Sequence, residues 1–118
     1  MDELSYLKQE INQLKSETYL NYSKKVEIAH KMLLEEKNKL NRLKNIKKRI
    51  SLKYNNSKKK KKIILNKLNQ RIDNKIKESN KGILKLNNLF NKYLNEFKQH
   101  REFLGLYDHS FLNEFYKD

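Results

Sequence analysis

The chain has 118 residues, of which 36% are hydrophobic and 36% are charged, and its formal net charge is +14 at pH 7. Such a composition cannot fill a broad globular core, but it can fill the narrow line of contact between paired helices of a single domain. Cysteine is absent, which excludes disulfides, thiolate metal sites and thiol nucleophiles. No apolar run exceeds three residues, so the sequence predicts no membrane span and no signal peptide.

The first half of the chain is predicted to form one helix over about residues 2–54. Proline is absent, and Asp2 and Glu3 stand where acidic side chains favour a helix start. Apolar residues recur at heptad spacing with one four-residue stutter. The predicted coiled-coil seam, meaning the line of a and d positions, comprises Leu4, Leu7, Ile11, Leu14, Thr18, Tyr22, Val26, Ala29, Leu33, Glu36, Leu40, Leu43, Lys47, Ile50 and Tyr54.

A turn is predicted at residues 55–58, because Asn tolerates left-handed backbone and Ser57 can cap the helix that follows. A second helix is predicted over about residues 59–104. Its seam comprises Leu65, Leu68, Ile72, Ile76, Ser79, Ile83, Leu86, Phe90, Tyr93, Phe97, His100 and Leu104. The predicted fold class is therefore all-α: a long antiparallel two-helix coiled-coil hairpin.

The chain is expected to end in a short helical tail over residues 105–118. Gly105 is a predicted helix stop, and Asp108 or Ser110 could cap the tail. The competing structure is a single continuous helix through residues 54–62, which would require self-association to bury its seam.

Positive charge is concentrated in the middle of the chain. Residues 37–72 contain fifteen Lys or Arg and no Asp or Glu. A predicted basic tip lies within this segment and consists of Lys58, Lys59, Lys60, Lys61 and Lys62. An AT-rich genome would also enrich a tolerant surface in Lys and Asn. Composition alone therefore leaves two explanations for the overall charge: a functional basic surface, or drift in codon usage.

The residues offer little catalytic chemistry. His30, His100 and His109 are far apart and lack the second histidine at i+3 or i+4 that a helical metal pair requires. No glycine-rich phosphate loop is present. We therefore predict a protein that is not an enzyme and has no cofactor.

Several segments of the sequence share a residue order that is more specific than heptad spacing alone. They are Val26-Glu27-Ile28-Ala29, Leu33-Leu34-Glu35-Glu36-Lys37-Asn38-Lys39-Leu40-Asn41-Arg42-Leu43, Leu68 with Ile72, Tyr93, Phe103, Leu106-Tyr107-Asp108 and Leu112-Asn113-Glu114-Phe115. Together they resemble the FliJ family, the small coiled-coil proteins of the bacterial flagellar export apparatus. The resemblance covers most of residues 26–115.

The resemblance implies a stalk-like two-helix coil that binds the hexameric export ATPase ring and the cytoplasmic domain of the membrane export gate. It also implies export chaperones as partners, and a place in the cytoplasm at the inner face of the membrane. Family positions for gate contact fall on Lys39, Leu43, Ile46, Ile50, Ile64, Leu68, Arg71 and Lys75. Of these, Ile46 and Ile64 lie off the predicted seam.

Two other classes of function fit the same features. One is a structural coiled-coil subunit, and the run Phe103-Leu104-Gly105-Leu106 faintly resembles Spc-type kinetochore subunits. The other is a small basic helical protein that binds nucleic acid. The second is disfavoured because Tyr54 is the only aromatic residue between Tyr22 and Phe90, whereas a single-strand platform needs several.

Overall fold

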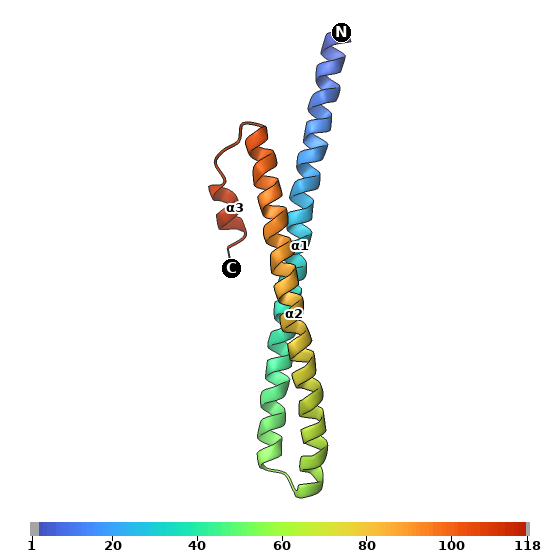
Figure 1. The fold of residues 1–118 in the computed structure, drawn as a ribbon, viewed down its shortest axis with the longest axis vertical. Coiled ribbons are helices and arrows are strands. Elements are labelled where there is room, and N and C mark those ends of the chain that lie inside the picture. Colours follow the sequence, from blue (N-terminus) through green and yellow to red (C-terminus); the bar gives the residue numbers. More distant parts are fainter. Residues whose placement is uncertain (1–2, 118) are drawn as a thin grey trace. The chain divides into compact units, whose positions relative to one another are not determined.

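The computed structural model describes residues 3–117 and consists of three helices (Figure 1). Helix α1 spans Glu3–Asn55, α2 spans Lys59–Phe103 and α3 spans Ser110–Phe115. These bounds confirm the predicted fold class, a two-helix hairpin with a short helical tail. Asp2, where the first helix was predicted to begin, lies outside the described residues.

A three-residue turn separates α1 from α2, so the alternative of one continuous helix is wrong. The hydroxyl of Ser57 donates a hydrogen bond to the carbonyl of Lys53, and its backbone N–H donates to the carbonyl of Tyr54 at 3.3 Å. Ser57 therefore terminates α1 instead of capping α2, contrary to our prediction. Among the described residues only Gly105 has a positive φ, so Asn55 and Asn56 form this turn without left-handed backbone.

The chain divides into two compact units. The first unit comprises Met1–Lys31 and Asn88–Asp118, and the second comprises Met32–Asn87. In the first unit α1, α2 and α3 share one core, whose buried side chains are Val26, Ala29, Phe90, Phe97 and Leu112. The short helix α3 thus has a packing role, because it contributes Leu112.

The second unit is a pair of helical segments with a smaller apolar core. Its buried cluster consists of Leu43, Ile50, Leu65 and Ile72, with Ile76 packed against it. A polar pair interrupts the apolar seam: the Ser79 hydroxyl is buried and donates a hydrogen bond of 2.9 Å to Oε1 of Glu36. A second cross-helix contact joins Nζ of Lys47 to Oδ1 of Asp73 at 2.5 Å.

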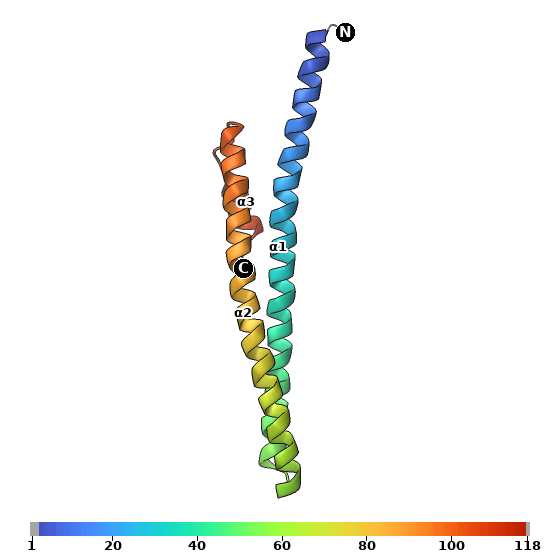
Figure 2. The same cartoon turned by 45° about the vertical axis from the view of Figure 1, so that its right-hand side comes forward.

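The predicted seam is buried or half-buried over most of its length. In α1 this holds at every predicted position from Tyr22 to Ile50, and in α2 at every position except Leu68. The two ends of the α1 seam were predicted wrongly, because Leu4, Leu7, Ile11, Leu14, Thr18 and Tyr54 are exposed. Figures 1 and 2 show that, within the first unit, the N-terminal turns of α1 continue beyond the end of α2.

The end of α2 is set by Gly105, as predicted. Gly105 has φ +87°, its N–H donates to the carbonyl of Glu102 at 2.9 Å, and the N–H of Leu106 donates to the carbonyl of Arg101 at 2.8 Å. This pair of bonds is the Schellman arrangement, which requires left-handed backbone at the residue after the helix. The chain then reverses toward α3.

Replacement of Gly82 by Ala is expected to stabilise the protein by about 0.5–1 kcal/mol, because glycine is a poor residue for a helix interior. A Cβ at this position would lie 3.6 Å from Oε1 of Glu36, which is ordinary van der Waals contact. Thermal or urea unfolding followed by circular dichroism would measure the gain. Gly105→Ala is the matched control and should destabilise, because its positive φ is strained for any other residue.

Candidate partner-binding site at the hairpin tip

The end of the second unit around the turn is strongly basic. The fifteen Lys and Arg residues of positions 37–72 all belong to this unit, and Lys58–Lys61 are exposed. Nζ of Lys62 lies 5.2 Å from the centroid of the Tyr54 ring, which is a cation–π contact. The first turn of α2 contains no acidic residue. Positive side chains therefore stand at the positive end of the helix dipole, where an acidic partner would relieve their repulsion.

Apolar side chains are exposed within about a dozen residues of the same turn. They are Ile46, Leu52, Ile63, Ile64 and Leu68. Each is exposed by 38–67%, and exposed apolar side chains that lie close together are typical of surfaces that bind other proteins. The combination of lysines and exposed aliphatic side chains suits a protein surface that is both acidic and apolar better than it suits a phosphate backbone alone.

A groove lies between α1 and α2 beside this surface. It is lined by Ile50, Ser51, Tyr54, Asn55, Leu65, Asn66 and Asn69. The side-chain oxygen of Asn69 is buried and has no hydrogen-bond partner among the described residues. A partner that donates a hydrogen bond into the groove would satisfy this oxygen.

The eight residues assigned to gate contact by resemblance fall into two groups. Leu43 and Ile50 are buried in the core of the second unit, where they pack between the helices. The other six are exposed, and they are Lys39, Ile46, Ile64, Leu68, Arg71 and Lys75. Only this second group lies on a surface that a partner could contact directly.

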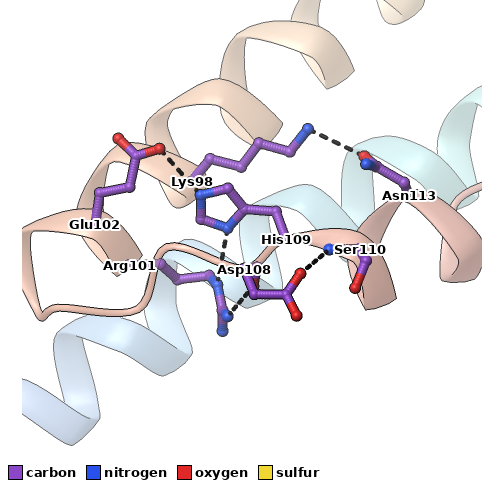
Figure 3. A network of polar contacts seen from close by, with 7 residues as sticks. All are labelled: Lys98, Arg101, Glu102, Asp108, His109, Ser110 and Asn113. Atoms are coloured by element: carbon purple, nitrogen blue, oxygen red, sulfur yellow. Dashed lines mark hydrogen bonds and ion pairs between the residues drawn. The ribbon is translucent and has the colours of Figure 1, made fainter.

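Sequence reasoning missed a polar network in the first unit (Figure 3). Its centre is Arg101, which is 7% exposed. The guanidinium donates to the hydroxyl of Tyr19 at 2.6 Å, to the carbonyl of Asp108 at 2.9 Å and to Nδ1 of His109 at 3.2 Å. It also lies 4.6 Å from the centroid of the Phe111 ring. Arg101 thus joins α1, the end of α2 and the segment that leads into α3.

The same segment prepares the start of α3. Oδ1 of Asp108 accepts a hydrogen bond of 3.0 Å from the N–H of Ser110, so Asp108 is the residue that meets the predicted capping role. This backbone hydrogen bond lowers the pKa of the Asp108 carboxyl below 3.8, with smaller contributions from the Ser110 side chain, His109 and Arg101. The ionised form therefore favours the folded tail, and this contribution is lost as the pH falls through the lowered value.

The described residues contain no cluster of three or more His, Asp or Glu side chains that could hold a metal ion. None of the helices in residues 3–117 is both long and apolar enough to cross a bilayer. The features that stand out at the tip are a basic surface and exposed aliphatic side chains, which are features of a binding surface.

No family model matches the chain, and no similar protein was found among the curated proteins or the solved structures. The function of the chain must therefore be inferred from the fold, from the hairpin tip and from the resemblance of the sequence to one family.

Proposed function

We propose that this protein is a non-enzymatic component of a bacterial flagellar type III export apparatus. It would act as a stalk-like coiled coil that binds the hexameric export ATPase and the cytoplasmic domain of the export gate, and it would promote the export of flagellar subunits. The observation that supports this proposal best is the antiparallel two-helix hairpin itself, because it is the fold that the resemblance to FliJ implies. Its place would be the cytoplasmic face of the membrane, reached through partners.

The residues would have separate roles in this proposal. Leu43 and Ile50 would hold the two helices together, since both are buried between them. The exposed side chains of Ile46, Ile64 and Leu68 would contact the gate, with Lys39, Arg71 and Lys75 at the edge of the contact. The basic tip would add a charge-dependent contact, which speeds encounter with an acidic partner more than it raises final affinity.

The direct experiment is assembly of a flagellar export ATPase into rings with and without this protein, at about 150 mM salt, where exposed charges are substantially screened. We expect the protein to increase both the hexamer fraction, measured by native mass spectrometry, and the rate of ATP hydrolysis. A variant with Lys58–Lys62 changed to Gln should reduce the stimulation if the tip takes part. The matched control changes five exposed lysines outside the tip, which are Lys24, Lys31, Lys81, Lys85 and Lys92.

Two results would overturn the proposal. The first is an absence of any effect on the ATPase combined with no binding to the gate domain. The second is retention on nucleic acid that weakens roughly several-hundred-fold between 50 and 200 mM salt, as about five phosphate contacts would predict. Retention of that kind would favour a basic nucleic-acid-binding protein instead. If the protein bound neither partner nor nucleic acid, a structural coiled-coil subunit would become the better explanation.

A further inference from the structure

The first four turns of α1 carry an apolar stripe that no described residue of the first unit covers. Leu4, Leu7, Ile11 and Leu14 are 43–62% exposed and follow the 3-4-3 spacing of a and d positions in a coiled coil. In the first unit α2 ends at Phe103, and α1 continues beyond that point (Figures 1 and 2). The stripe is therefore presented on a helix that is already formed.

This stripe is a different face of α1 from the one that packs on α2. The α2-facing positions Tyr19 and Tyr22 continue toward the N-terminus at heptad spacing through Lys15, Asn12 and Lys8, which are polar. Asn12 and Lys15 indeed line a groove with Leu104 and Leu106 at the end of α2. Leu7, Ile11 and Leu14 each precede one of these polar positions by one residue, and Leu4 likewise precedes Ser5 at the next heptad position, which turns the stripe by about 100° around the helix. A longer α2 would not bury the stripe, but a separate helix could.

The charges that flank the stripe indicate which helix fits. With Leu4 and Ile11 at a positions, the g positions are Glu3, Glu10 and Glu17 and the e positions are Lys8 and Lys15. In a parallel pair, each g side chain faces the e side chain five residues further along the partner. Glu3 would then meet Lys8 of a second copy, and Glu10 would meet Lys15. In an antiparallel pair g faces g and e faces e, which would place like charges together.

We propose that two copies of this chain associate through residues 3–17 as a short parallel coiled coil. The segment is self-complementary. With three Glu and two Lys it lacks the large positive net charge of the rest of the chain, so two copies of it do not repel each other strongly. The a and d positions that follow are Thr18 and Asn21, so the apolar contact ends after two heptads. Because so small an interface is typical of weak association, we expect a dissociation constant on the order of 100 µM. This inference does not depend on the proposed export function.

The first test is sedimentation velocity between about 5 µM and 1 mM protein at about 150 mM salt, a range that brackets the expected dissociation constant. The double variant Glu3→Lys with Glu10→Lys should weaken the dimer at least about tenfold, and so should Lys8→Glu with Lys15→Glu, because every flanking pair becomes repulsive. Mixing the two variants should restore association. The control Glu35→Lys with Glu78→Lys alters exposed acids of the second unit and should leave the dimer unchanged.

Orientation is tested with single cysteines, since the chain has none of its own. In a parallel pair Leu4→Cys lies against itself and should oxidise to a covalent dimer. In an antiparallel pair the two copies of residue 4 would be about 15 Å apart along the axis, and a Leu4→Cys chain would instead crosslink with a Leu14→Cys chain. The proposal is overturned by that mixed crosslink, by a monomer at every concentration, or by a dimer whose dissociation constant is unchanged by both charge reversals.

Discussion

Replacement of Phe97 by Ala is expected to lower the free energy of unfolding by about 3–5 kcal/mol, which is the usual cost of deleting a large buried aromatic side chain. Phe97 is 2% exposed and belongs to the core that α1, α2 and α3 share in the first unit. Its ring meets that of Tyr19 edge to face, with centroids 5.0 Å apart. Small domains are stable by only about 5–15 kcal/mol, so this loss would dominate the stability of the first unit.

The measurement is urea unfolding followed by circular dichroism, together with amide hydrogen exchange to locate the change. We expect faster exchange in residues 88–103 than in the second unit, because the core that is lost belongs to the first. Phe103→Ala is the matched control, since Phe103 lies on the same helix but is 86% exposed. Similar losses of stability in the two variants would contradict the assignment of Phe97 to the core.

Replacement of Arg101 by Met is expected to release α3 from the first unit at a cost of about 2–4 kcal/mol. Methionine keeps much of the apolar stem, but it removes the donors that reach Tyr19, the carbonyl of Asp108 and His109. Hydrogen bonds from a charged group contribute about 1.5–3 kcal/mol each. The net loss of stability is smaller than the sum of these hydrogen bonds, because the variant no longer has to desolvate a buried guanidinium on folding.

Release of α3 is measured by limited chymotrypsin digestion and by exchange of the Leu112 and Tyr116 amides. These amides donate to the carbonyls of His109 and Leu112, and they should exchange quickly once α3 detaches. Arg71→Met removes the same charge from an exposed site of α2 and should leave digestion unchanged. If α3 resists digestion and exchange in the Arg101→Met variant, packing of Leu112 is sufficient to hold α3 on the first unit.

The long helices could be predicted because their determinants are local. Proline is absent, the heptads continue over both halves of the chain, and Asn55 and Gly105 stand at the two helix ends. The exposure of the four seam positions Leu4, Leu7, Ile11 and Leu14 could not be predicted in the same way. It depends on where α2 stops along α1 and on which face of α1 it meets, and both are properties of the packed hairpin.

The candidate site was predictable in part. The basic tip follows from a run of five lysines beside a turn signal, so no tertiary information was needed to find it. The resemblance also pointed to Leu43 and Ile50, which stand at seam positions and are buried. Arg101 could not be singled out among 28 basic residues, because its burial depends on the return of the chain after Gly105.

The hydrogen bond between Ser79 and Glu36 affects the register in which the two helices of the hairpin pair. A slip of α2 by one heptad would place Ile72 or Leu86 opposite the Glu36 carboxylate and bury that charge against hydrocarbon. Repeating heptads of Leu and Ile discriminate poorly between such misaligned pairings, whereas one buried polar residue can specify register at some cost in stability. Ser79 thus restricts the folding chain to one alignment, and replacing both partners, Ser79→Leu with Glu36→Leu, should yield a more stable but less uniquely aligned coil.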